Sequence, residues 1–309
     1  MIIVIGGATA SGKTAVGSQI AKQLNTSIVS ADSMQIYKWM DIGTAKISDE
    51  MLGVKQYCID LISPLENFSV VDYRDHADKA ISEILSDHKI PIVVGGTGYF
   101  ISSILYQMSF GYSDELVDVN GDIRLELENE FKLNGILNLY KELIFLDPEA
   151  AQKIHFNNTK RVLRALEVIK TTGKKYSTQN DQIIHRQNEY QLYIITSKNR
   201  QERAKRISAR TDLMYKIGLK DEVDRLLSMG CNYNMQSMQG IGYKEWEDFD
   251  KHKYNLNDTL DYIKINTRQY AKRQDTWFNN KYKEATYLDI ELGLNNIYEY
   301  IMKRIPSNT

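Results

Sequence analysis

The sequence has few cysteines, little net charge and no long apolar run. Two cysteines, Cys58 and Cys231, occur with no CxxC pair and no neighbouring histidine pair, so we expect neither a structural zinc site nor a disulfide framework. The net charge is -1, so a nucleic-acid partner would need local clusters of Lys and Arg. No run approaches the ~18 apolar residues of a membrane span, and no basic leader precedes the first apolar run. We therefore expect a cytoplasmic protein without a membrane partner.

Short apolar runs alternate with helical patterns along the 309 residues. This alternation predicts an α/β fold, in which helices cover both faces of a parallel sheet. Residues 112–188 show helical signals but no strand signal, which predicts a helical insertion domain. The rest, residues 1–111 and 189–309, would form the phosphate-binding core with a helical C-terminal part. The predicted strands are residues 2–5, 27–30, 58–62, 90–94 and 190–196.

The segment GATASGKT at residues 7–14, called the phosphate loop below, matches the pattern GxxxxGK[ST] directly after the first predicted strand. Its glycines let backbone N–H groups face a polyphosphate, Lys13 adds a positive charge, and the Thr14 hydroxyl can bind Mg²⁺. We therefore predict a di- or triphosphate site, whose phosphates need not belong to a nucleotide. The loop residues are Gly7, Ala8, Thr9, Ala10, Ser11, Gly12, Lys13 and Thr14.

Polar residues also follow two other predicted strands. Asp32 lies at the strand edge where parallel-sheet enzymes do chemistry, as a general base or a water-mediated Mg²⁺ ligand, or it caps the next turn. Thr97 follows Gly95-Gly96 as a helix cap or a ligand contact. The fourth strand lacks the acidic residue that holds the metal in phosphate-loop NTPases, which argues against ATP or GTP hydrolysis.

Three sets of basic residues share helical faces by i,i+3 or i,i+4 spacing. Each alone is typical of a solvated surface. Together, with Tyr262, Tyr270 and Trp277 nearby, they favour an RNA backbone or a second phosphate as partner. The sets are Lys160, Arg161 and Arg164; Arg203, Arg206 and Arg210; and Lys264, Arg268 and Lys272.

Over nearly its whole length, the chain resembles the tRNA dimethylallyltransferases. Family members usually have Pro at the position of Ala8, Asp and Gln in the region of Asn158, Thr159 and Lys160, and Arg at the position of Asn279. The matching segments are GATASGKT (7–14), SADSMQIYKWMDIGTAK (30–46), VVGGTGYFI (93–101), KRVLRALEVIKTTGK (160–174), RISARTDLMYKIGL (206–219), GIGYKE (240–245) and TRQYAKRQDTWF (267–278).

The resemblance implies that a dimethylallyl group passes from dimethylallyl diphosphate to the exocyclic N6 amine of the adenosine immediately 3′ of the anticodon. Lys13, Mg²⁺ at Thr14 and Arg210 would neutralise the leaving diphosphate, Asp32 would accept the amine proton, and Thr97 would orient a substrate. The partner would be the anticodon stem-loop, and we expect a monomer. The implied tRNA-binding residues are Asp32, Ser33, Met34, Gln35, Thr97, Arg124, Lys160, Arg161, Val162, Leu163 and Arg164.

Two other classes of function fit parts of the sequence. A small-molecule kinase would transfer phosphate from ATP, and an AMP-prenylating relative would not need the insertion or the basic helices. A non-catalytic nucleotide- or RNA-binding protein would not need Asp32.

Overall fold

The computed structural model describes residues 1–107, 122–178, 184–185 and 189–306. The chain divides into a core unit, Met1–Leu105 with Arg186–Thr309, and an inserted unit, Tyr106–His185. The insertion expected from sequence, residues 112–188, therefore begins and ends a few residues from the division that the structure gives. Of that range, residues 112–121, 179–183 and 186–188 lie outside the described residues.

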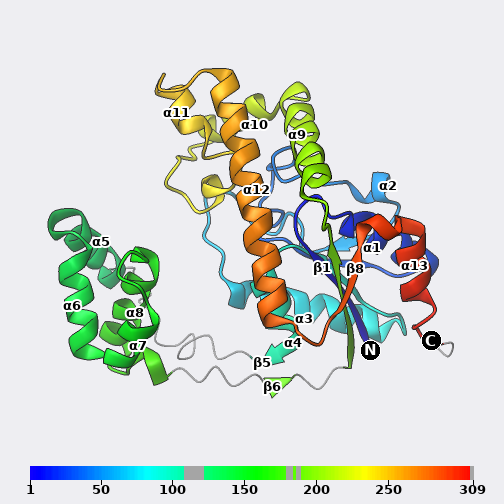
Figure 1. The fold of residues 1–309 in the computed structure, drawn as a ribbon, viewed down its shortest axis with the longest axis horizontal. Helices are drawn as coiled ribbons and strands as arrows, with labels where there is room; N and C mark the ends of the chain where they lie inside the picture. The colour runs from blue at the N-terminus through cyan, green and yellow to red at the C-terminus, as the bar shows by residue number, and fades with distance from the viewer. Residues whose placement is uncertain (108–121, 179–183, 186–188, 307–309) are drawn as a thin grey trace. The chain divides into compact units, whose positions relative to one another are not determined.

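The core unit contains a six-stranded sheet in the order β3-β2-β4-β1-β7-β8, and its neighbouring strands are all parallel (Figure 1). The α/β prediction is thus confirmed. The central strand β1 pairs with β4 on one side and with β7 on the other, so Ile5 is in register with both Val94 and Tyr193. The strands are β1 (Ile2–Gly7), β2 (Ile28–Ala31), β3 (Gln56–Tyr57), β4 (Ile92–Gly95), β7 (Tyr190–Thr196) and β8 (Thr286–Asp289).

Two strand predictions need correction. The predicted strand at 58–62 does not form, because Cys58 and Asp60 have φ values of 61° and 53°, which interrupt an extended backbone. Instead β3 ends at Tyr57, and Ile62 forms an isolated bridge with Tyr37. The sequence prediction also missed β8, a four-residue edge strand, and β6 (Ile184–His185), which lies inside the range 112–188 that was expected to contain no strand.

Helices cover both faces of the sheet. On one face, Ile3 and Ile5 pack with residues of α1 and α13, including Val16 and Ile297. On the other, α3, α4 and α12 contact the strands. The long α12 is the orange helix in Figure 1. No helix among the described residues is long and apolar enough to cross a membrane. The core-unit α-helices are α1 (Lys13–Gln23), α2 (Asp49–Leu52), α3 (Val70–Ser86), α4 (Gly98–Leu105), α9 (Arg200–Lys216), α10 (Leu219–Ser228), α11 (Trp246–Asp250), α12 (Leu256–Lys281) and α13 (Leu294–Met302).

The inserted unit has its own apolar core, which Leu127, Leu139, Leu143 and Leu166 help to form. Its first and last described segments pair as a short antiparallel ladder with Tyr106 opposite His185. The elements are β5 (Tyr106–Gln107), α5 (Asp122–Asn134), α6 (Ile136–Leu146), α7 (Pro148–Lys153), α8 (Thr159–Thr172) and β6 (Ile184–His185).

Candidate active site

The phosphate loop links the end of β1 to the start of α1. Gly12 precedes the helix with a φ of 85°, a left-handed conformation that glycine adopts without steric cost. A Cβ at Gly7 would lie 2.5 Å from the Ile195 carbonyl oxygen, so the tight path of the loop requires glycine there. The Ser11 hydroxyl is buried and has no hydrogen-bond partner among the described residues. The loop thus combines a helix N-terminus with an unpaired hydroxyl, which suits an anion.

Three charged side chains interact at this loop. Burial lowers the pKa of Lys13 to about 8, the negative charge of Asp32 opposes this shift, and the positive charge of Arg210 adds to it. Arg210 is exposed, but desolvation by its surroundings lowers its pKa, and the charge of Asp32 opposes this shift. The structure therefore brings together two cations, on α1 and α9, with the carboxylate of Asp32, which follows β2.

Asp32 and Thr97 follow adjacent strands. Asp32 Oδ1 accepts a hydrogen bond from the Met34 N–H at 3.0 Å, so Asp32 does form the local turn considered as the alternative. This bond also orients the carboxylate. Thr97 Oγ1 accepts from the Ser33 N–H at 3.0 Å and donates to Ser33 Oγ at 3.2 Å. The Thr97 hydroxyl therefore ties the end of β4 to the segment that follows β2.

Two residues of α12 join this site; Gln274 was not predicted, and Tyr270 was expected only as an aromatic neighbour of a basic helix. The buried Gln274 accepts from the Thr9 N–H and donates to the Gly96 carbonyl oxygen, each at 2.9 Å. It thereby connects the phosphate loop to the end of β4. Burial, and to a smaller extent the charge of Asp32, raises the pKa of Tyr270 to about 12. Hydrogen bonds with Thr97 and Gln274 act in the opposite direction. The i,i+4 spacing of Tyr270 and Gln274 in the TRQYAKRQ segment places both on one face of α12, but this spacing does not tell a buried face from a solvent-facing one.

The basic residues of α9 lie against the phosphate loop. Arg203 is buried in an ion pair with Asp275, with 2.6 Å between Nη1 and Oδ2. Arg206 donates to the Ala10 carbonyl oxygen at 3.1 Å and to Ser197 Oγ at 2.8 Å. Arg203 and Arg206 therefore make structural contacts within the protein, and Arg210 is the member of this set that acts electrostatically on Lys13.

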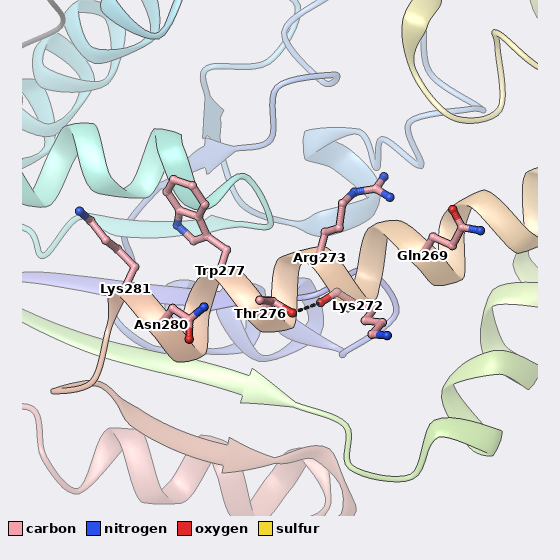
Figure 2. A pocket seen from close by; sticks show the side chains of 7 residues that line it. All are labelled: Gln269, Lys272, Arg273, Thr276, Trp277, Asn280 and Lys281. Atoms are coloured by element: carbon pink, nitrogen blue, oxygen red, sulfur yellow. Dashed lines mark hydrogen bonds between the residues drawn. The ribbon is translucent and has the colours of Figure 1, made fainter. Parts of the chain in front are cut away.

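In the basic set of α12, one residue is held by an ion pair and two are exposed. Lys264 forms an ion pair with Asp212 at 2.7 Å, whereas Arg268 and Lys272 are exposed. Trp277 makes an edge-on contact with the Tyr99 ring, with 6.1 Å between the ring centroids. Figure 2 shows that side chains from successive turns of α12 line one depression. They are Gln269, Lys272, Arg273, Thr276, Trp277, Asn280 and Lys281.

In the inserted unit, α8 carries Lys160, Arg161 and Arg164 on its exposed side. Arg164 and Arg124 both approach Glu167, at 3.3 and 3.4 Å. The side chains of the intervening residues, Val162 and Leu163, are 0% and 4% exposed within the apolar core. We therefore restrict the side-chain contacts expected from this segment to the three cations.

The chain is similar to known proteins over most of its length. A model of the family described as IPP transferase matches residues 35–281. The tRNA dimethylallyltransferase of Clostridioides difficile (strain 630) is 43% identical over 291 residues, or 94% of this chain and 92% of that protein. A solved tRNA delta(2)-isopentenylpyrophosphate transferase from Staphylococcus epidermidis is 37% identical with a TM-score of 0.70, covering 100% of this chain and 99% of that one. A solved eukaryotic dimethylallyltransferase acting on tRNA is 27% identical with a TM-score of 0.81, covering 99% and 81%.

Proposed function

The chain belongs to the IPP transferase family and has tRNA dimethylallyltransferase activity, and we propose that the phosphate loop, Asp32 and Thr97 form its active site. The reaction converts the adenosine immediately 3′ of the anticodon to N6-isopentenyladenosine and releases diphosphate. The observation that best supports this site is the mutual electrostatic influence of Lys13, Arg210 and Asp32. Two cations suit a leaving diphosphate, and one carboxylate suits the proton of the attacking amine.

Departure of the diphosphate requires neutralisation of its charge. The allylic C–O bond breaks more readily as positive groups stabilise the oxygen that leaves. In this site the first N–H groups of α1, the Ser11 hydroxyl, Lys13 and Arg210 are available for that purpose. The phosphate loop therefore binds a leaving group and takes no part in phosphate transfer.

The amine is the nucleophile. As N6 forms a bond to C1 of the dimethylallyl group, the C1–O bond breaks and the N6 proton passes to the Asp32 carboxylate. The Met34 N–H holds one carboxylate oxygen and so fixes the direction of the other. The adenosine must leave its stack to reach this edge of the sheet. Ser33, Met34 and Gln35 would then contact the displaced nucleotide and its neighbours.

Mg²⁺ fits the site through few protein ligands. The described part of the chain has no group of three His, Cys, Asp or Glu side chains able to hold a metal. Mg²⁺ commonly keeps several waters and binds substrate phosphates with only one or two protein oxygens. The Thr14 hydroxyl, in the first turn of α1, would be such a ligand. When bound, Mg²⁺ would add charge neutralisation for the leaving diphosphate.

The anticodon stem-loop would be held by cations outside the reaction centre. In the inserted unit, exposed Lys160, Arg161 and Arg164 suit RNA phosphates, and Arg124 lies beside Glu167, as Arg164 does. Phosphate contacts of this kind position an RNA without reading its sequence.

A transfer assay tests the proposed site. The protein is incubated with an anticodon stem-loop and labelled dimethylallyl diphosphate, with and without Mg²⁺, and a parallel reaction contains ATP labelled at the γ-phosphate. We expect label from the diphosphate in the RNA and no transfer from ATP. Asp32→Asn should slow transfer by about 10²- to 10⁴-fold, whereas Asp87→Asn, which alters an exposed carboxylate at the end of α3, should leave the rate unchanged. Normal transfer by Asp32→Asn would refute the proposed base.

A further inference from the structure

A buried glutamate in α10 organises a turn that is distant in sequence. The Glu222 side chain is 2% exposed. Its Oε2 accepts from the N–H groups of Asp41 and Ile42, each at 2.8 Å, and its Oε1 accepts from the Gly43 N–H at 3.0 Å. One carboxylate thus receives three successive backbone donors. Residues 41–44 are called the 41–44 turn below.

Tyr243, in the GIGYKE segment, completes the environment of this carboxylate. Its hydroxyl donates to Glu222 Oε1 at 2.7 Å, and its ring packs so closely on Gly43 that a Cβ there would lie 2.5 Å away. Burial and the charge of Glu222 hold the pKa of Tyr243 well above its usual value, so the hydroxyl stays a donor. The nearest guanidinium, that of Arg225, is 3.9 Å from Glu222 Oε2 and half-exposed. The turn and Tyr243 therefore supply most of the stabilisation of the buried charge.

The 41–44 turn also forms a hydrogen bond with the side chain of Gln35. The Thr44 carbonyl oxygen accepts from Gln35 Nε2 at 3.2 Å, and Ser30 Oγ donates to Gln35 Oε1 at 3.0 Å. These two bonds fix which way the amide group faces. A glutamine amide has two N–H donors and two acceptor lone pairs, so one donor and one acceptor remain. Such a pair matches the edge of a nucleobase.

The GIGYKE segment also supports the residue beside Gln35. A Cβ at Gly240 would lie 2.5 Å from Met34 Cε, so the end of the Met34 side chain packs directly on the backbone at Gly240. Tyr243 and Gly240 therefore act on the same short segment through two separate contacts. None of these contacts involves the phosphate loop.

We propose that Glu222 is a positioning residue for RNA recognition, which holds the 41–44 turn so that the Gln35 amide presents one donor and one acceptor to a base of the tRNA. The inference rests on the proposed function, in which Gln35 contacts RNA. Glu222 itself does not touch either substrate.

Glu222→Gln is the most direct test, because it keeps the size of the side chain but replaces one acceptor oxygen with a donor. Whichever oxygen is replaced, the new NH₂ group faces an existing donor, so the turn must shift. We expect affinity for an anticodon stem-loop, measured by fluorescence anisotropy, to fall about tenfold or more. The KM for dimethylallyl diphosphate should stay within about twofold, because the phosphate loop keeps its own contacts. Amide hydrogen exchange at residues 41–43 should increase.

Three further variants make the test specific. Asp224→Asn changes an exposed carboxylate on the same helix and should leave RNA affinity and exchange unchanged. Glu222→Asp keeps the charge and should restore part of the affinity. Tyr243→Phe removes one hydrogen-bond donor to Glu222 and should also weaken RNA binding. If circular dichroism shows that Glu222→Gln does not fold, RNA binding by Tyr243→Phe becomes the deciding measurement.

A double-mutant cycle separates this inference from the proposed function. If Glu222 acts through Gln35, adding Glu222→Gln to Gln35→Ala should cause little further loss of affinity. Loss by the same factor in both backgrounds would overturn the positioning role, as would wild-type binding and exchange in Glu222→Gln. A harmless Gln35→Ala would instead refute the RNA contact assigned to Gln35 in the proposed function.

Discussion

The charge of Lys13 should make diphosphate binding depend on pH. With a pKa of about 8 in the free protein, Lys13 is about 90% protonated at pH 7 and about 10% at pH 9. Only the protonated form attracts the anion fully, so the apparent affinity should fall about ninefold between these values. Bound diphosphate raises the pKa of Lys13, so Lys13 stays protonated in the complex. The pH dependence of the affinity therefore reports the pKa of Lys13 in the free protein. Isothermal titration of inorganic diphosphate with Mg²⁺ between pH 6.5 and 9.5 measures it.

Two substitutions identify the titrating group. Lys13→Arg keeps the positive charge throughout this range and should remove the share of the pH dependence that Lys13 causes. The Lys13→Met variant should bind diphosphate weakly at every pH. The affinity of the wild type should fall toward that of Lys13→Met near pH 9.5. Free diphosphate also loses its last proton in this range, so the wild-type affinity is compared at each pH with that of Lys13→Arg, and the ratio of the two isolates the contribution of Lys13. A ratio that stays constant from pH 7 to 9 would refute the lowered pKa of Lys13.

Three other predictions concern separate parts of the chain. Asp32→Ala should slow single-turnover transfer by about 10²- to 10⁴-fold while both substrates still bind, and a rate within a few-fold of wild type would contradict its role as base. Trp39 has a φ of 64°, so Trp39→Gly should be more stable than Trp39→Ala by about 0.5–1 kcal/mol, because both variants lose the indole packing and only glycine adopts this φ without strain; urea unfolding compares them, and equal stability would refute the backbone argument. The double substitution of Arg161 and Arg164 by Ala should weaken stem-loop binding. The slope of log affinity against log salt concentration should also become shallower by the equivalent of about two phosphate contacts. An unchanged slope in anisotropy titrations would exclude these RNA contacts.

Strands with a continuous apolar run could be predicted from the sequence, and those defined by backbone geometry could not. β1, β2, β4 and β7 are buried runs bounded by turn residues, which is the pattern of a parallel strand. The segment 58–62 also contains apolar residues, but Cys58 and Asp60 have left-handed backbone conformations, which interrupt an extended strand. β8 was missed because it is a short edge strand with only Leu288 buried.

The candidate site divides in a similar way. Lys13 could be found because it belongs to a recognisable loop motif, and Asp32 because it directly follows a strand. Gln274 and Glu222 could not, since a polar residue in a helix usually marks the solvent-facing side. Their importance depends on burial and on partners far away in sequence, such as Thr9 for Gln274. Neither burial nor these partners can be inferred from local spacing.

The position of β7 beside β1 has a consequence for folding during synthesis. The first four strands of the sheet are complete at Gly95, but the second edge of β1 is covered only when Tyr190–Thr196 has been made. At about 5–20 residues per second, that interval lasts roughly 5–20 s, during which the apolar β1 has an open edge. The helices of the inserted unit, which contact one another over short sequence distances, can fold in that interval. A ribosome stalled between these segments would therefore expose a strand edge prone to aggregation, and chaperone binding should be strongest there.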